Sequence, residues 1–186
     1  MSRLSRRALL AGGAAAVALT AGCGNPVGNF NADRLEARVD ATRDFLRNNY
    51  PETQELFRNA HGILYMPLVS EAGFFVGGAY GQGALRINDV TVDYYSATRA
   101  SVGLQVGAQQ YAHVLFFMTA QALADFRASE GWAGSADLRY AVPEGGGSAG
   151  IQTTTVFSPV IAVVFGQSGL IAGASLAGVR YQRIIP

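Results

Sequence analysis

The chain opens with a hydrophobic run that is too short to cross a membrane as a helix. The run covers 14 residues from Ala8 to Ala21, whereas a helix needs about 20 apolar residues to span the hydrocarbon layer. Arg6 and Arg7 precede it, and small residues lead from it into Cys23. These features are typical of a twin-arginine lipoprotein signal. We therefore predict an export signal peptide over residues 1–22, with an uncleaved transmembrane helix as the alternative.

Cys23 is the only cysteine of the 186-residue chain, so the protein forms no internal disulfide. A lone cysteine at a signal junction is better explained by acylation, and we expect the mature protein to begin there. Residues 23–31 then form a lipid-bearing tether. Gly24 follows the cysteine. In a Gram-negative source, glycine at this position favours attachment of the protein to the periplasmic face of the outer membrane.

The next periodic segment predicts an amphipathic helix that begins after Asn31 as its N-cap. At 100° per residue one apolar stripe forms, consisting of Leu35, Val39, Thr42 and Leu46. Basic residues border it, with Arg34 and Arg38 on one flank and Arg43 and Arg47 on the other, and the acids Asp33, Glu36, Asp40 and Asp44 are expected opposite. Docking of the stripe on the protein's own domain is the favoured interpretation. Contact of the arginine-flanked helix with membrane is the alternative.

Pro51 suits the start of a second short helix over residues 52–59, and a β pattern follows from Ile63 onward. A single further helix is expected over residues 119–128. The expected strands cover residues 63–66, 73–87, 90–95, 101–109, 113–118, 137–142, 151–157, 160–165, 170–176 and 179–184. We expect one α+β domain over residues 32–186, with a helical lead-in (32–60) and a β-rich core (61–186). Its sheet should be mainly antiparallel, forming a strongly curved sheet or partly closed β-barrel.

Aromatic residues stand in adjacent pairs, at Phe74-Phe75, Tyr94-Tyr95 and Phe116-Phe117. Because side chains alternate along a strand, we expect one member of each pair to be buried and the other exposed. Three exposed rings on one side would make a lipid-facing patch.

The charge of the chain excludes nucleic acid as a partner. All 14 basic residues are arginines, against 13 acids, and the signal peptide contains three of them and no acid. The mature protein therefore carries a net charge of −2 with scattered arginines. A nucleic-acid binder shows a clustered basic surface instead.

No motif of the sequence indicates catalysis, a metal or a cofactor. The G-x-G-x-x-G string of residues 145–150 precedes β-branched residues rather than a helix, which indicates a hairpin loop. His61 and His113 have no ligand spacing. No serine lies in a G-x-S-x-G elbow. Asp89 and Asp93 could meet in space, although most such pairs are solvated turn residues.

Three glycine-patterned blocks resemble the SYLF domain and occur in its order. They are Gly73–Leu85, Ser101–Gly107 and Ser168–Gly178, and Ala122–Phe126 resembles the helix between the second and third blocks. The resemblance extends from about Glu52 to the C-terminus. It departs from the family where Tyr94-Tyr95 replaces the usual tryptophan, and over residues 132–150.

The SYLF resemblance implies a lipid-binding module without catalytic activity. Eukaryotic relatives join phosphoinositide membranes to actin, and bacterial relatives are often exported lipoproteins. We therefore expect a non-enzymatic lipoprotein that binds membrane lipid through acylated Cys23, and a lipid ligand or envelope protein through its domain. The oligomeric state stays open. The alternatives are an envelope scaffold acting through protein contacts and a hydrolase whose serine and acid meet only in the fold.

Overall fold

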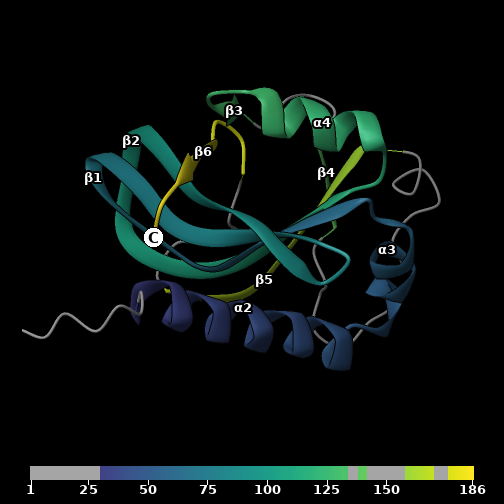
Figure 1. Ribbon diagram of the computed structural model, residues 1–186. Helices are drawn as coiled ribbons and strands as arrows, with labels where there is room; N and C mark the ends of the chain where they lie inside the picture. Colours follow the sequence, from purple (N-terminus) through teal and green to yellow (C-terminus); the bar gives the residue numbers. More distant parts are fainter. Residues whose placement is uncertain (1–29, 134–137, 142–157, 170–175) are drawn as a thin grey trace, which may run out of the picture. The chain divides into compact units, whose positions relative to one another are not determined.

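The computed structural model describes residues 30–133, 138–141, 158–169 and 176–186. Helix α2 (Phe30–Asn49) is followed by a 3-10 turn (Pro51–Thr53) and helix α3 (Gln54–Asn59). The strands are β1 (Gly62–Ile87), β2 (Val90–Phe117), β3 (Trp132–Ala133), β4 (Leu138–Ala141), β5 (Val160–Gly169) and β6 (Arg180–Ile184). Helix α4 (Ala120–Ala128) lies between β2 and β3. Figure 1 shows these elements in a strongly curled sheet with few helices, which confirms the expected α+β class.

Strand β2 is the hub of the sheet. One edge pairs with β1 over nearly its whole length. The other edge pairs with β6 over residues 94–98 and with β5 over residues 109–117. The order among these strands is β3-β6-β2-β5-β4, and all of the recorded pairings are antiparallel except that of β4 with β5. Two strands were expected within the range of β1 and three within the range of β2. The structure joins each set into one long bent strand, because β-bulges absorb the irregular positions, including Pro67, without ending the ladder.

Asn88 and Asp89 form the two-residue turn between β1 and β2. Both have positive φ, 52° and 61°. That conformation is the one required by the tight hairpin turns that match strand twist, and Asn and Asp tolerate it better than most residues. The turn falls where the expected strands 73–87 and 90–95 left a gap.

The two halves of β1 pack against each other because the sheet curls. A Cβ placed on Gly81 would lie 2.7 Å from the carbonyl oxygen of Leu68, and one on Gly83 would overlap the carbonyl oxygen of Tyr65. Glycine is therefore needed at these positions so that backbones far apart along the strand can approach.

The sheet is covered on both faces where β1, β2 and β5 meet. Leu35, Val39 and Leu46 of α2, with Leu56 of α3, pack on one face. Leu123 and Phe126 of α4 pack on the other. The predicted helical stripe is therefore confirmed and docks on the domain.

Cover on both faces also corrects the expected alternation of aromatic residues. Phe116 and Phe117 are both fully buried, one in each cluster. Tyr95 is buried and Tyr94 is half-buried, while the side chains of Phe74 and Phe75 lie outside those described. The expected strand 151–157 and most of strand 170–176 also lie outside the described residues.

Candidate functional site

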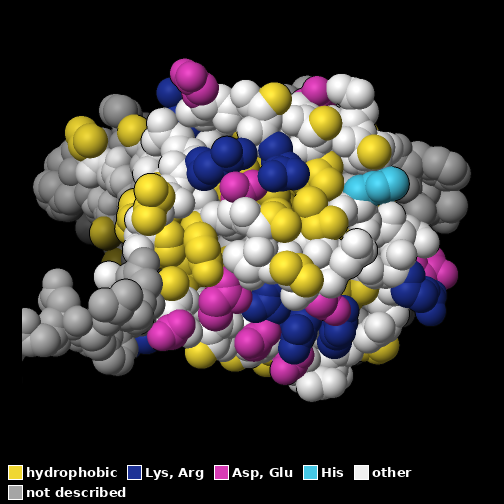
Figure 2. All heavy atoms as spheres, in the orientation of Figure 1, with side chains coloured by type: hydrophobic (Ala, Val, Ile, Leu, Met, Phe, Trp, Pro, Cys, Tyr) yellow, Lys and Arg dark blue, Asp and Glu magenta, His cyan; other side chains and the backbone are white. Residues whose placement is uncertain are grey.

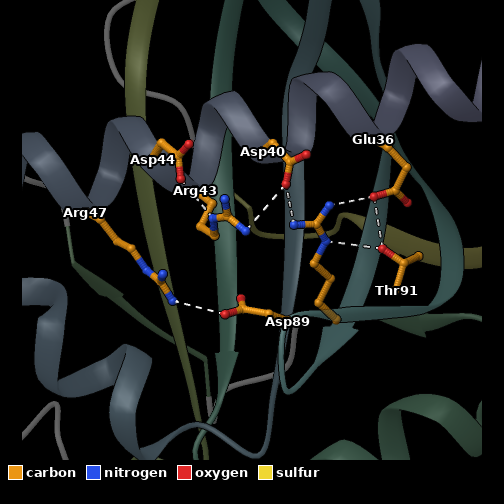
Figure 3. A network of polar contacts seen from close by, with 8 residues as sticks. Glu36, Asp40, Arg43, Asp44, Arg47, Asp89 and Thr91 are labelled. Atoms are coloured by element: carbon orange, nitrogen blue, oxygen red, sulfur yellow. Dashed lines mark hydrogen bonds and ion pairs between the residues drawn. The ribbon is translucent and has the colours of Figure 1, made fainter.

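Helix α2 presents two different flanks, one tied to the sheet and one open. Figure 2 shows basic and acidic side chains alternating along the tied flank, and Figure 3 shows their contacts. The open flank borders a groove. We describe the tied flank first because it fixes the position of the helix.

Arg86 of β1 is the centre of the tied flank. Its side chain is only 7% exposed, and its Nη2 and Nη1 atoms lie 2.5 Å from Glu36 Oε2 and 2.7 Å from Asp40 Oδ1 (Figure 3). Arg86 Nε also donates to Thr91 Oγ1 at 3.2 Å, and that hydroxyl donates to Glu36 at 3.1 Å. The contacts made by Glu36 and Asp40 join α2 to the turn end of the β1–β2 hairpin. Sequence analysis placed Glu36 and Asp40 opposite the stripe, and this was wrong because Arg86 draws them toward the sheet.

The network keeps the acidic residues ionised. Burial opposes ionisation of Glu36, but hydrogen bonds with Arg86, Tyr94 and Thr91 outweigh it and lower its pKa. The hydrogen bond from Arg86 is the main reason why the pKa of Asp40 is lowered. The charged forms are therefore the ones that hold the helix.

Arg43 and Arg47 continue the tied flank toward the C-terminal end of α2. Arg43 contacts Asp44 at 2.9 Å and Asp40 at 3.5 Å. Arg47 Nη2 lies 3.6 Å from Asp89 Oδ2, and its guanidinium carbon lies 4.7 Å from the centre of the Phe57 ring. Both arginines are half-buried. Their charges are already balanced within the domain.

The open flank of α2 carries the other two candidate arginines, Arg34 and Arg38. Both are exposed, and no ion pair to either is found within the part of the chain that the structure describes. They border a groove of about 440 Å³. It is lined by Asn31, Arg34, Leu35, Arg38, Pro67, Leu68, Ser70, Tyr80, Gly81, Gln82, Ile185 and Pro186.

Apolar side chains face solvent around this groove. Leu68 is 38% exposed, Tyr80 is 53% exposed and Ile185 is 96% exposed. A hollow of about 280 Å³ adjoins the groove and shares Pro67 and Leu68 with it. On the α2 side it is lined by Ala41, Thr42 and Phe45, which lie on the same flank as Arg34 and Arg38. Two unpaired guanidinium groups therefore stand at one end of a partly apolar channel beside α2, which we call the α2 groove.

A separate group of polar side chains is buried within the sheet. Glu71 is 3% exposed, forms an ion pair with Arg99, and accepts a hydrogen bond from Gln109 Nε2 at 2.8 Å. His113 is fully buried and its Nε2 lies 2.8 Å from the Tyr181 hydroxyl. Burial lowers the pKa of His113 to about 3, so the ring is neutral. His113 is therefore a neutral core residue whose Nε2 atom pairs with Tyr181, while no partner of its Nδ1 atom is found among the described residues.

The catalytic alternatives find little geometric support. Asp89 and Asp93 do not form a pair, since Asp89 contacts Arg47 and Asp93 contacts Arg127 and Arg183. His61 is exposed at the end of the segment that follows α3. Among the residues that the structure describes, no three His, Cys, Asp or Glu side chains gather as metal ligands. Within the same residues, no helix has the length and hydropathy needed to cross a bilayer.

Several sequence candidates lie outside the described residues, namely Cys23, Arg6, Arg7 and the 145–150 loop. Arg86, Leu68 and Tyr80 were not predicted from the sequence as site residues. A charged residue between Leu85 and Ile87 in a strand was a signal for Arg86, because a cation inside an apolar run needs a partner. Leu68 and Tyr80 gave no signal, since only the curl of β1 brings them to one groove.

Comparison with known families gives a match over the C-terminal part of the chain. Residues 98–183 match the Ysc84 family, described as Las17-binding protein actin regulator. This confirms the SYLF resemblance for the second and third glycine blocks, while the first block precedes the matched segment. No curated protein matches the chain.

Proposed function

We propose that this protein, whose residues 98–183 match the Ysc84 (SYLF) family, is an exported, non-enzymatic lipoprotein that binds membrane lipid. Acylated Cys23 anchors it to the cell envelope. The α2 groove takes one phospholipid of the membrane to which the chain is anchored. The family is of a lipid-binding or actin-regulating type and is generally non-enzymatic. This supports a binding role without catalysis.

The anchor rests on the first 23 residues of the sequence. Paired arginines, a short apolar run and a lone cysteine after small residues together favour export followed by acylation. Each methylene of an acyl chain contributes about 0.8 kcal/mol on entering the membrane, so two or three chains supply lasting attachment. The groove then needs only to select and orient lipid.

The lipid site rests on the open flank of α2. Phosphate is recognised by guanidinium groups, and Arg34 and Arg38 have no carboxylate partner in the described part of the chain. Leu68, Tyr80 and Phe45 supply apolar surface next to them. A volume of about 440 Å³ falls within the usual range of small-ligand sites. The observation that carries the proposal is the placement of two arginines, without an ion-pair partner in the described part of the chain, at the end of a partly apolar channel.

The four candidate membrane-facing arginines fall into two pairs that differ in their contacts. Arg43 and Arg47 are engaged with Asp44 and Asp89, so binding phosphate would require them to lose those contacts. We therefore assign headgroup recognition to Arg34 and Arg38 alone. Arg43 and Arg47 position the helix.

Membrane fractionation of the full chain tests the anchor. Wild-type protein should enter the membrane fraction and carry acyl groups at Cys23 in mass spectra. Cys23→Ser should be released into the soluble fraction or accumulate unprocessed. Wild-type protein that is soluble and unmodified at Cys23 would contradict the anchor.

Native mass spectrometry of the Cys23→Ser chain tests the groove separately. We expect phospholipid to co-purify with this variant, and the further change Arg34→Gln with Arg38→Gln to reduce its occupancy. Equal occupancy in both proteins would place lipid elsewhere.

One observation favours an envelope scaffold as the second candidate function. Among the described strands β1 pairs only with β2, so its other edge is open to another chain. Val76 and Tyr80 of β1 are exposed. A stable oligomer in light scattering, formed without lipid and lost on introducing proline at Val76, would favour this function over lipid binding.

A further inference from the structure

Two arginines converge on one aspartate beside α4, away from the α2 groove. Arg127 Nε of α4 lies 3.1 Å from Asp93 Oδ2, and Arg183 Nε of β6 lies 3.2 Å from Asp93 Oδ1. The Asp93 side chain is 14% exposed, whereas Arg127 and Arg183 are 41% and 53% exposed. The face drawn in Figure 2 shows basic side chains beside an acidic one below α4. One shielded carboxylate therefore orients two guanidinium groups that reach solvent.

The orientation of the two arginines leaves hydrogen-bond donors unused. Arg183 Nη2 donates to the backbone oxygen of Arg127 at 3.2 Å. Arg127 uses its Nε atom on Asp93, and no contact of its two terminal nitrogens to another described residue is found. A guanidinium group has five N–H donors. The Arg127 guanidinium is thus held by Asp93 through its Nε atom, and its two terminal nitrogens are available to a ligand.

An open pocket of about 470 Å³ lies against both arginines. It is lined by Ser96, Arg127, Ala128, Ser129, Glu130, Gln182, Arg183 and Ile184. Gln182 is exposed, and its side-chain amide can donate hydrogen bonds to a ligand. The Ser129 hydroxyl already donates to the backbone oxygen of Phe126 at 3.1 Å. Most of these side chains are polar or charged.

We propose that this pocket binds an oxyanion, and that its ligand is a phosphate-bearing small molecule. Guanidinium groups held in fixed positions recognise phosphate through paired N–H donors, and prior orientation by Asp93 removes part of the entropic cost of binding. Glu130 is the one acid that lines the pocket, and it limits the affinity by repelling the same ligand. The proposal is independent of the α2 groove, since α4 and α2 pack on opposite faces of the sheet.

Isothermal titration of the Cys23→Ser chain with inorganic phosphate and with glycerol 3-phosphate tests the proposal, with sodium chloride at matched ionic strength as the reference. We expect saturable binding of phosphate above the chloride background. Arg127→Gln should weaken it about tenfold, because a charge-assisted hydrogen bond is lost. Arg58→Gln is the matched control, since Arg58 is 69% exposed and lies outside the pocket. Glu130→Gln should strengthen binding.

A second, more conservative variant tests the same residue in case Arg127→Gln fails to fold. Arg127→Lys keeps the charge but not the paired donors, and it should also bind phosphate more weakly than Arg58→Gln does. Vesicles that contain phosphatidylglycerol distinguish the source of the phosphate. Competition between these vesicles and glycerol 3-phosphate at Arg127 would assign the site to a lipid headgroup and overturn the small-molecule ligand. No phosphate binding above chloride, or equal binding by Arg127→Gln and Arg58→Gln, would overturn the site itself.

Discussion

Asp40 of α2 accepts a hydrogen bond from Arg86 Nη1 of β1 at 2.7 Å, across 46 positions of sequence. The arginine is 7% exposed and the aspartate 49% exposed, so a buried cation meets carboxylates at the surface. This arrangement sets which flank of α2 is held and which stays open over the α2 groove.

Arg86→Met should destabilise the domain by about 2 kcal/mol, because Glu36 and Asp40 lose their shared cation while the methionine keeps part of the packing. Chemical denaturation at neutral pH measures this change. Arg58→Met is the control, since it removes an exposed pair with Glu55 at 3.8 Å and should cost less than about 0.5 kcal/mol. Equal midpoints for the two variants would show that the network does not hold α2.

His113 should make the domain less stable as the pH falls below 6.5. Its pKa is about 3 in the folded protein against 6.5 for a free histidine, so between these values the unfolded chain binds a proton that the folded chain does not. The stability that this difference provides is complete above pH 6.5 and declines toward pH 3. From pH 7 to pH 5 this group alone should account for a loss of about 2 kcal/mol.

Denaturation curves of His113→Gln measure the histidine contribution. We expect the His113→Gln variant to be less stable than the wild type at pH 7. Its free energy of unfolding should nevertheless change less between pH 7 and pH 5 than that of the wild type. The carboxylates Glu36 and Asp40, whose pKa values are lowered, contribute mainly below this range and are present in both proteins. His61→Gln removes the other histidine, at an exposed position, and is the matched control. An unchanged slope in His113→Gln would contradict the burial of a neutral imidazole.

Gly83→Ala should destabilise the protein by about 2 kcal/mol or more, because the new methyl group would overlap the Tyr65 carbonyl oxygen and the Met66 sulfur. Gly131→Ala is the control. Its methyl group would meet only the flexible Arg180 side chain, at 3.3 Å or more, which can move aside. Thermal unfolding of both variants tests whether the curl of β1 requires glycine at position 83.

The helices and the fold class could be predicted because their signals are local. The stripe of α2 from Leu35 to Leu46 follows a helical period, and Thr119 caps α4 by accepting from the Ala122 amide at 3.1 Å. Strand continuity was harder to predict. Pro67 and the glycines resemble strand ends in sequence, yet bulges carry β1 through them.

The candidate site was predicted only in part for a related reason. The helical period separated Arg34 and Arg38 from Arg43 and Arg47, as the structure confirms. Arg86 and Asp89 determine which pair of arginines has its charge balanced within the domain. Both lie on the β1–β2 hairpin, and the helical period of α2 does not predict where that hairpin packs. The groove itself depends on the approach of Leu68 and Tyr80, and this follows from the tertiary curl of one strand.

Vesicle flotation at low salt tests the central claim, that Arg34 and Arg38 bind lipid headgroups at the α2 groove. The Cys23→Ser chain is mixed with equimolar vesicles of phosphatidylethanolamine and phosphatidylglycerol, so that the anchor takes no part. Arg34→Gln with Arg38→Gln should weaken binding about tenfold or more, since each arginine near an anionic surface contributes about 1 kcal/mol. Arg58→Gln with Arg180→Gln, which removes two other exposed arginines, should bind as the parent does. Equal binding by the two double variants, or none by the parent chain, would contradict the account.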